Sequence, residues 1–398
     1  MKAIIPALAI LAGATACTTT PEAIRGTSQG KAAWTIDNGE ISLTVTEQGT
    51  HTAPVLFRRG GRTIQPYHIS PWQGEGYTTD CKVLEPLRGD FFCLPFGGNG
   101  TAFNGEKFPP HGETCGEPWK LEGVTTVGDT TTASFAIDLK IRAGHVVRNL
   151  SLVKGQPAIY SKTVVTGFAG PASFAHHAIL PLPAQARSLL ISTSPFELGM
   201  TPPYHFDDAQ SFASGKTFET LALVPLATPE SATDDCSSLP APRKHTDLLA
   251  MYQKPAAATP KVPAWLAAVN TVDHTLWFSL KDPVLMPARV MWIENFGRQG
   301  APWSGRNRCV GLEDGCMFFD AGIAESVAGN VVNRQGVPTF FTFTGKPTEI
   351  RYIEGAIPVP ETFGRVASAV FGTSEVTFID VKGQRVTIPV NHQFLFAR

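Results

Sequence analysis

The chain has 398 residues, a formal net charge of −1 and only 17% charged residues. This balance gives no electrostatic reason to expect nucleic acid or an anionic membrane surface as a partner. Glycine (37 residues) and proline (32 residues) are abundant, which argues against a helical bundle and favours many short strands joined by turns.

Residues 1–17 have the features of an export signal. Lys2 precedes an apolar run over 3–11, and small residues then end at Cys17. The run is shorter than the roughly 20 apolar residues that span a bilayer. Small residues before a cysteine resemble the lipobox of bacterial lipoproteins, although Ala14 stands where leucine is usual, so both lipid attachment at Cys17 and plain cleavage nearby remain open. We predict an exported, periplasmic protein that contacts a membrane only through such a lipid, and a flexible tether over 18–31.

Residues 32–398 are predicted to form one large, mostly antiparallel β-sandwich, an all-β fold. A hairpin is expected over 34–45 around the turn Asn38-Gly39. Over 131–142, apolar residues alternate with polar ones, as in a strand with one buried face. Further strands are expected over 53–57, 62–67, 145–153, 158–166, 217–224, 276–280, 289–293, 339–343, 348–353 and 375–396. The best short helical candidates are 265–269 and 362–370, and the segment 228–263, rich in Pro, Ala, Ser and Asp, is predicted as a long surface loop.

Besides Cys17, the chain has six cysteines, and an even set in an exported protein favours disulfides over free thiols. The sequence cannot choose among the possible pairings of Cys81, Cys93, Cys115, Cys236, Cys309 and Cys316. No CxxC pair or HExxH motif is present, so a metal site is not expected.

Three clusters carry residues suited to acid–base chemistry. The first is HGETCGEPW, with His111 on a loop; the second is FAHHAILPLP, with His176 and His177 at the end of a strand. The third is RNRCVGLEDGC, whose alternation places Glu313 on the same strand face as Gly311. A strand with a small residue beside a carboxylate can bring a ligand close to the backbone. The alternative is a structural or surface role for each histidine and for the glutamate.

In their order along the chain, these motifs resemble the aldose 1-epimerase (galactose mutarotase-like) family. The resemblance runs from about residue 34 to the end and is carried by EQGTHTAPVLF, HGETCGEPW, KTVVTGFAGPASFAHHAILP and GLED. It implies the supersandwich fold of that family, an active-site histidine at His111, a general acid at His177 in preference to His176, and a general base at Glu313. No residue of this chain securely matches the family's substrate-holding aspartate. Asp207 and Asp208 are the only positions considered for it.

The chemistry implied by the resemblance is interconversion of sugar anomers. A proton leaves the anomeric hydroxyl while another reaches the ring oxygen, the ring opens, C1–C2 rotates, and the steps reverse. A carboxylate and an imidazole can each act as acid or base, and each well-placed group contributes roughly 10²–10⁴-fold. No metal or organic cofactor is needed, and the expected ligand is a monosaccharide or the end of an oligosaccharide.

Further substrate-binding candidates lie beside these motifs. Aromatic rings suit the apolar faces of sugars, which points to Trp72, Trp119 and Trp303, although core packing would explain each of them equally well. His176 is the remaining imidazole candidate. Arg306 and Arg308 have side chains suited to a carboxylate or phosphate of a substrate; bracing of neighbouring loops, or pairing with Asp314 or Asp320, is the favoured alternative.

Two other functions stay open at this level. One is a carbohydrate-binding lipoprotein that keeps the fold without turnover, because fold does not fix function. The other is a glycoside hydrolase or lyase on the same sandwich, in which Glu313 would pair with Glu113 or Glu117 about 5–9.5 Å away. The sugar and the oligomeric state are not determined by the sequence.

Overall fold

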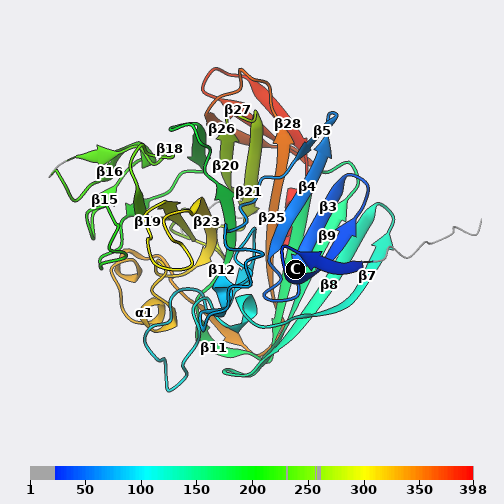
Figure 1. The fold of residues 1–398 in the computed structure, drawn as a ribbon, viewed down its shortest axis with the longest axis horizontal. Coiled ribbons are helices and arrows are strands. Elements are labelled where there is room, and N and C mark those ends of the chain that lie inside the picture. The colour runs from blue at the N-terminus through cyan, green and yellow to red at the C-terminus, as the bar shows by residue number, and fades with distance from the viewer. Residues whose placement is uncertain (1–22, 230–231, 256, 258–260, 398) are drawn as a thin grey trace, which may run out of the picture.

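The protein is built almost entirely of antiparallel β-sheet (Figure 1). The structure is a computed structural model that describes residues 23–229, 232–255, 257 and 261–397. None of the helices in these ranges has the length and apolar character that a bilayer-spanning helix requires. The predicted export signal, Cys17 and the first part of the predicted tether lie outside the described residues.

A nine-stranded sheet forms the middle layer of the molecule. Its strands, from one edge to the other, are β18 (Ser238–Leu239), β13 (Leu189–Thr193), β20 (Ala264–Asn270), β21 (Thr275–Lys281), β25 (Thr348–Pro358), β10 (Ala158–Thr166), β9 (Gly144–Val153), β8 (Thr130–Leu139) and β7 (Lys120–Val127). The strands that follow one another along the chain pair as hairpins, and β25 joins the two halves of the sheet by pairing with β21 and β10.

A seven-stranded sheet carries the candidate site. Its strands, in order, are β15 (Thr217–Phe218), β14 (Leu198–Met200), β19 (His245–Tyr252), β22 (Ala288–Asn295), β23 (Arg308–Cys316), β12 (Phe174–Pro181) and β6 (Phe92–Cys93). All these strands lie away from the β7–β9 edge of the nine-stranded sheet (Figure 1).

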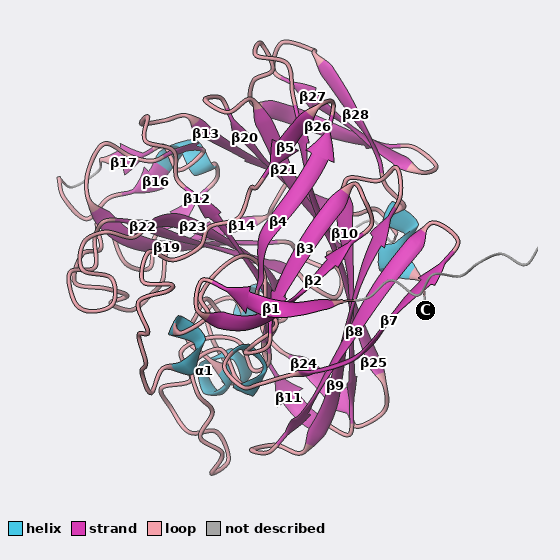
Figure 2. Ribbon diagram, turned by 45° about the vertical axis from the view of Figure 1, so that its right-hand side comes forward, coloured by secondary structure: helices cyan, strands magenta, loops and turns pink. Residues whose placement is uncertain are grey.

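The remaining elements are small sheets and short helices. A five-stranded sheet contains β1 (Ile24–Ser28), β2 (Lys31–Asp37), β3 (Ile41–Thr46), β4 (Thr52–Arg59) and β5 (Arg62–Ile64), and a three-stranded sheet contains β26 (Val366–Phe371), β27 (Glu375–Asp380) and β28 (Arg385–Pro389). Two strand pairs are β11 (Ala169–Ala172) with β24 (Phe341–Thr344) and β16 (Val224–Pro225) with β17 (Thr233–Asp234). The helices are α1 (Ile323–Val327) and the 3-10 helices η1 (Lys82–Leu84), η2 (Glu113–Cys115), η3 (Leu221–Leu223), η4 (Asn333–Gln335) and η5 (His392–Phe396). Figure 2 shows β1–β4 in front of the half of the nine-stranded sheet that contains β7–β10.

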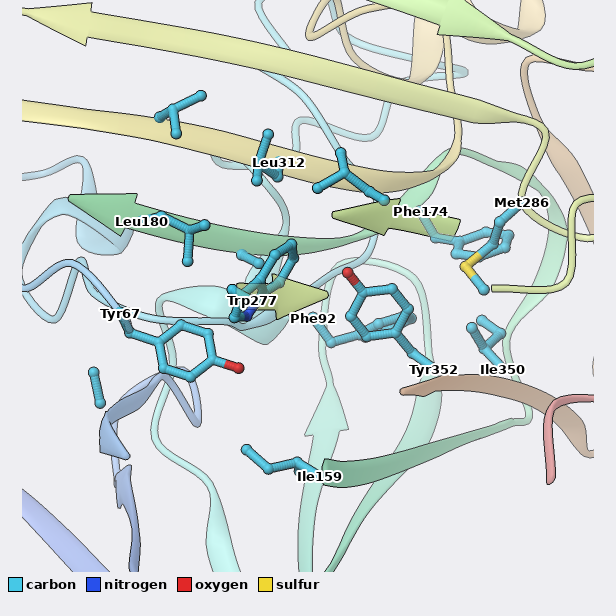
Figure 3. Close-up of a cluster of buried hydrophobic side chains, with 14 of the residues drawn as sticks. Tyr67, Phe92, Ile159, Phe174, Leu180, Trp277, Met286, Leu312, Ile350 and Tyr352 are labelled. Carbon is cyan, nitrogen blue, oxygen red and sulfur yellow. The ribbon is translucent and has the colours of Figure 1, made fainter. Parts of the chain in front are cut away.

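Alternation along the strands divides the apolar side chains among three clusters. The main core lies between the nine-stranded sheet and the five- and seven-stranded sheets, and it contains Trp277 and Tyr352 of the nine-stranded sheet together with Leu180 and Leu312 of the seven-stranded sheet (Figure 3). The opposite face of the nine-stranded sheet, including Phe278, packs on the three-stranded sheet. The third cluster covers the outer face of the seven-stranded sheet.

These observations confirm the all-β fold class and most of the predicted strands. The hairpin at Asn38-Gly39 is present as β2 and β3, where the Asn38 side-chain oxygen accepts hydrogen bonds from the backbone N–H groups of Glu40 and Ile41. The alternating segment 131–142 is present as β8.

Four predictions of local structure were wrong. The predicted helix 265–269 is part of β20, which is buried on both faces, so that its continuous apolar run lacks the alternation typical of a strand. The second predicted helix, 362–370, contains most of β26. The predicted surface loop 228–263 contains β19, another strand buried along its whole length. Of the predicted strand 217–224, Thr217–Phe218 form β15 and Val224 begins β16, but the residues between them include the 3-10 helix η3.

Part of the segment 18–31 that was predicted as a flexible tether is a strand instead. Ile24–Ser28 form β1, which pairs along its whole length with β2. The guanidinium group of the fully buried Arg88 donates hydrogen bonds to the backbone oxygen and the hydroxyl of Ser28 and to the side chain of Gln29. This segment is therefore attached to the domain.

Candidate functional site

The site is organised around a cross-strand pair. In the antiparallel ladder of β12 and β23, His177 lies directly opposite Glu313. Its Nε2 atom is 3.2 Å from Glu313 Oε1, and both side chains are almost completely buried. The two residues are far apart in the sequence, and the register of these two strands brings them together on the outer face of the seven-stranded sheet.

Gly311 makes room for this pair. A Cβ atom at position 311 would lie 2.6 Å from Glu313 Oε1 and 3.3 Å from His177 Cε1 and from Trp292 Cβ. Because side chains alternate along a strand, Gly311 and Glu313 share a face, as predicted, and Trp292 of β22 lies opposite Gly311. A side chain at this position would displace the carboxyl group of Glu313.

His111 reaches the same place from a loop. Its backbone has a φ of +61°, and the next residue, Gly112, packs so closely that a Cβ there would lie 2.0 Å from the carbonyl oxygen of Leu94. A glycine at position 112 is therefore required by the close contact of this loop with Leu94, the residue after β6. The ring centroid of His111 is 5.3 Å from that of His177, and the two rings lie edge to face.

Phe91 fixes the plane of the His177 ring. The Phe91 ring stacks on His177 at 4.6 Å and on His51 at 3.9 Å, with interplanar angles of 22° and 23°. His51 is held in turn through its Nε2 atom, 2.9 Å from the carbonyl oxygen of Cys115. The backbone N–H of His177 donates to the carbonyl of Phe91 at 3.0 Å. This stack leaves His177 little rotational freedom.

A pocket opens over these residues and encloses about 490 Å³, counting its mouth. It is lined by Val83, Leu84, Leu87, Phe91, His111, His177, Phe206, Leu248, Trp292, Arg298, Trp303, Glu313 and Asp320. Three of these residues carry a buried polar atom that has no hydrogen-bond partner among the described residues: His111 Nδ1, His177 Nδ1 and Trp292 Nε1. Unpaired buried polar atoms are costly, so their concentration here indicates a polar ligand.

Burial moves the proton affinities of the pair in opposite directions. It raises the pKa of Glu313 well above its ordinary value, with a smaller contribution from Asp320. It lowers the pKa of His177 well below its ordinary value, helped by the nearby His111 and His51. Burial, with the charge of Arg298, also lowers the pKa of His111 to about 4. Both pKa shifts of the pair favour the neutral forms, so a proton shared by the pair is favoured on Glu313. Strongly shifted groups in a cleft are typical of catalytic sites.

The structure adds two polar residues to the pocket that the sequence analysis missed as ligand-binding groups, Arg298 and Asp320. Asp320 accepts a hydrogen bond from the hydroxyl of Tyr204 at 2.6 Å, and burial raises the pKa of its carboxyl group. Both residues lie in loops with no motif of their own, so the only available signal was their proximity in sequence to β22 and to GLED.

Two of the predicted aromatic residues are at the pocket. Trp303 lines it, and Trp72 packs edge to face against Trp303 at 4.8 Å between ring centroids. Trp72 itself is buried and its Nε1–H donates to the carbonyl of Leu84. Trp303 can thus contact a ligand, whereas Trp72 packs against Trp303 and does not line the pocket.

Three predicted substrate-binding residues lie elsewhere. Trp119 is buried in the main core, where its Nε1–H donates to the carbonyl of Thr114. His176 points to the opposite face of β12 from His177, where it stacks on Tyr352 at 4.3 Å. Arg308 is outside the pocket: its Nε donates to Asn295 Oδ1. None of these three predicted residues lines this pocket, because two of them face the core and Arg308 braces a strand.

The acidic residues considered in the sequence have structural roles. Glu113 accepts hydrogen bonds from the backbone N–H groups of Lys140 and Ile141, so it cannot pair with Glu313 across a substrate. Glu117 does not line the pocket. Asp207 contacts Arg298, and Asp208 contacts His205 at the surface.

The favoured bracing role is observed for Arg306, which forms a two-bond ion pair with Glu75. Asp314 pairs instead with Lys281 and Arg289. Neither predicted alternative pairing, with Asp314 or Asp320, is formed.

The predicted disulfides are not present. Cys81, Cys93, Cys115, Cys236, Cys309 and Cys316 are all free thiols in the structure. In the described ranges no group of three or more His, Cys, Asp or Glu side chains is placed to hold a metal ion.

The fold and pocket together define a large antiparallel β-sandwich with a buried His177–Glu313 pair on the outer face of one sheet. No protein-family model and no curated protein sequence matches the chain. Solved structures match it at low identity. A candidate aldose 1-epimerase from Klebsiella pneumoniae is 14% identical, with a TM-score of 0.58 over 85% of this chain and 83% of that one. A galactose mutarotase-like protein from Clostridium acetobutylicum is 12% identical, with a TM-score of 0.54 over 85% and 98%.

A galactose mutarotase related enzyme from Lactobacillus acidophilus is also similar, at 12% identity and a TM-score of 0.51 over 82% of this chain and 98% of that one. The chain therefore has the galactose mutarotase-like fold.

Proposed function

We propose that the protein is an aldose 1-epimerase-like mutarotase, which interconverts the α and β anomers of a reducing sugar. The observation that carries this proposal is the His177–Glu313 pair, 3.2 Å apart in the pocket, with His111 beside it. The similarity of fold to mutarotase-like proteins supports it.

The pair supplies both proton transfers. One group accepts the proton of the anomeric hydroxyl while the other protonates the ring oxygen; the C1–O5 bond breaks and the open aldehyde forms. Rotation about C1–C2 followed by the reverse transfers closes the ring as the other anomer. Each group is an acid in one direction and a base in the other. In the unliganded pocket the elevated pKa of Glu313 and the depressed pKa of His177 favour Glu313 as the first proton donor, which reverses the acid and base roles that the family resemblance implies.

Polarimetry or NMR of freshly dissolved α-anomers of several aldoses tests the proposal. The wild-type protein is expected to accelerate approach to anomeric equilibrium, and Glu313→Gln and His177→Ala are each expected to lose about 10²–10⁴-fold in kcat. Glu375→Gln and His145→Ala change exposed residues of the same types and should keep the full rate. If no aldose equilibrates faster while calorimetry detects sugar binding, the carbohydrate-binding alternative replaces the enzyme.

A pH profile gives an independent check. Because the active pair holds one proton, kcat should be flat around neutral pH. It should fall at high pH, when Glu313 loses its proton, and at low pH, when His177 gains one. A single inflection near pH 6.5, the value of an ordinary histidine, would contradict the assignment of His177.

A glycoside hydrolase is a second candidate, because Asp320 places a second carboxyl group in the pocket with Glu313. Two carboxyl groups across a glycosidic bond are the usual requirement for hydrolysis. Release of nitrophenol from nitrophenyl glycosides, abolished by Asp320→Asn, would support it, and anomerisation without such release would exclude it.

A further inference from the structure

Arg298 is held in the pocket by aromatic rings. Its guanidinium carbon lies 4.8 Å from the ring centroid of Trp303 and 5.6 Å from those of Trp292 and Phe206. The side chain is 25% exposed and lines the same pocket as the catalytic pair. Stacking against three rings fixes the plane of the guanidinium group, so the direction of its N–H bonds is set before any ligand binds.

Only one edge of this guanidinium group is used by the protein. Nε donates to Asp207 Oδ2 at 2.8 Å, and the same atom is 3.9 Å from Glu294 Oε2. Among the described residues, neither terminal nitrogen of Arg298 has a hydrogen-bond acceptor. An arginine held through Nε in this way keeps its two terminal nitrogens as a fork, the arrangement that binds a carboxylate or phosphate with two parallel hydrogen bonds.

The groups around Arg298 leave its two terminal nitrogens without a carboxylate partner among the described residues. Burial raises the pKa values of Glu294, Glu313 and Asp320, which favours their uncharged forms. Asp207 is the carboxylate in direct contact, on the edge of the guanidinium group at Nε. In such apolar surroundings an ion pair is screened less than in water.

We propose that the pocket accepts an aldose carrying an anionic group, a carboxylate or a phosphate ester, which binds to the terminal nitrogens of Arg298 while His177 and Glu313 act on the anomeric carbon. This inference rests on the proposed function and names its substrate class. Arg298 is a binding residue here, and its role is to select the sugar and to orient it.

The test compares anionic with neutral sugars in the same assay. Anomeric exchange is measured by NMR for glucuronate, galacturonate, glucose 6-phosphate, glucose and galactose, at low and high ionic strength. At least one anionic sugar is expected to have a kcat/KM about 10- to 100-fold above its neutral counterpart, the usual contribution of hydrogen bonds to a charged group. Added salt should reduce this ratio. The uronates and the phosphate ester distinguish the two kinds of anion.

Variants show whether Arg298 is responsible. Arg298→Gln should bring the anionic-to-neutral ratio close to one, and Arg298→Lys should restore part of it. Because both sugars are measured on the same variant, a partial loss of folded protein cancels from the ratio. Arg308→Gln, outside the pocket, is the matched control and should keep the wild-type ratio. Equal or better turnover of neutral sugars by the wild type, or an unchanged ratio in Arg298→Gln, would overturn the proposal.

The same reagents separate this inference from the proposed function. If no sugar is turned over but glucuronate or glucose 6-phosphate binds in calorimetry and the binding is lost in Arg298→Gln, the anion site stands and the mutarotase proposal fails. If only neutral aldoses bind and react, the mutarotase proposal stands and the anion site fails.

Discussion

At the scale of single residues, a shift of one position in the sequence separates a side chain in the pocket from one in the core. His176 and His177 are neighbours in sequence, yet one contacts Asp90 in the core and the other contacts Glu313 in the pocket. The pleat of β12 alone separates them, since successive side chains of a strand point to opposite faces.

Gly311→Ala should impair catalysis directly. The added Cβ would lie 2.6 Å from Glu313 Oε1, so the carboxyl group must move from its place beside His177. We expect a fall in kcat of about 10²-fold, because small misplacements of catalytic groups are costly, and a loss of about 1–3 kcal/mol in stability from overpacking. The assay is the NMR exchange rate together with urea unfolding. Gly329→Ala, where a Cβ meets nothing within 4 Å, is the control and should match the wild type.

Glu313→Gln should stabilise the protein at neutral and alkaline pH. Since the folded-state pKa of Glu313 lies above the unfolded value near 4.5, the folded chain holds this proton more tightly. The free energy of unfolding therefore falls as pH rises from about 4.5 towards the folded-state pKa. Glutamine removes this dependence. Thermal unfolding from pH 4 to pH 9 should show a melting temperature difference that grows with pH and vanishes at pH 4; a variant less stable than wild type at pH 8 would contradict the buried, protonated carboxyl.

At the scale of elements, β12 and β23 present the His177–Glu313 pair on one face and belong to a buried polar network on the other. Asp90, beside β6, contacts Arg148 of β9 and His176 of β12, and the side chains of Asp90 and Arg148 have no exposed surface. This network crosses the main core between the seven- and nine-stranded sheets. Buried ions of this kind are tolerated only when they are paired.

Asp90→Ala should therefore destabilise the fold strongly. It leaves Arg148 buried without its carboxylate, a change that costs about 3–5 kcal/mol. Urea unfolding followed by tryptophan fluorescence measures the loss. Asp138→Ala removes an exposed carboxylate that pairs with His145 at the surface, and this control should cost less than about 1 kcal/mol. Equal effects of the two substitutions would show that the Asp90 pair contributes no more than a surface pair.

At the scale of the whole molecule, the three-stranded sheet at the C-terminus closes the second core. Its residues Val376 and Phe378 pack against Trp265 and Phe278 on the face of the nine-stranded sheet that is turned away from the pocket. In Figure 1, β26–β28 lie at one end of the nine-stranded sheet.

A chain ending at Pro358 should not give a soluble, folded protein. It lacks β26–β28 and η5, and it would expose the apolar face that contains Trp265, Phe278 and Ile353. Exposed apolar surface of this extent promotes aggregation. A chain ending at Val390 keeps β26–β28 and loses only η5, so it should remain soluble with a lower melting temperature. Size-exclusion chromatography and circular dichroism compare the two, and a monomeric, folded shorter chain would show that the three-stranded sheet is dispensable.

The sequence by itself determined the β-rich class, the hairpin at Asn38-Gly39, and the alternation that puts Gly311 and Glu313 on one face, because these features depend on neighbouring residues. The order of the motifs also pointed to His111, His177 and Glu313, which the structure brings together at one pocket. Strands buried on both faces, such as β20, gave no alternation and were misassigned for that reason.

Only the tertiary structure decided which other side chains share the pocket. Arg298 and Asp320 come from loops whose placement depends on how the strands pair and pack over long sequence separations. The sequence offered Arg306 and Arg308 as candidates for binding an anionic substrate but favoured a bracing role, and the structure directs those side chains to Glu75 and Asn295, while Arg298 lines the pocket. Trp119 was likewise indistinguishable from a ligand platform until packing placed it in the core. Such long-range register is a property of the folded sheet, and no local pattern encodes it.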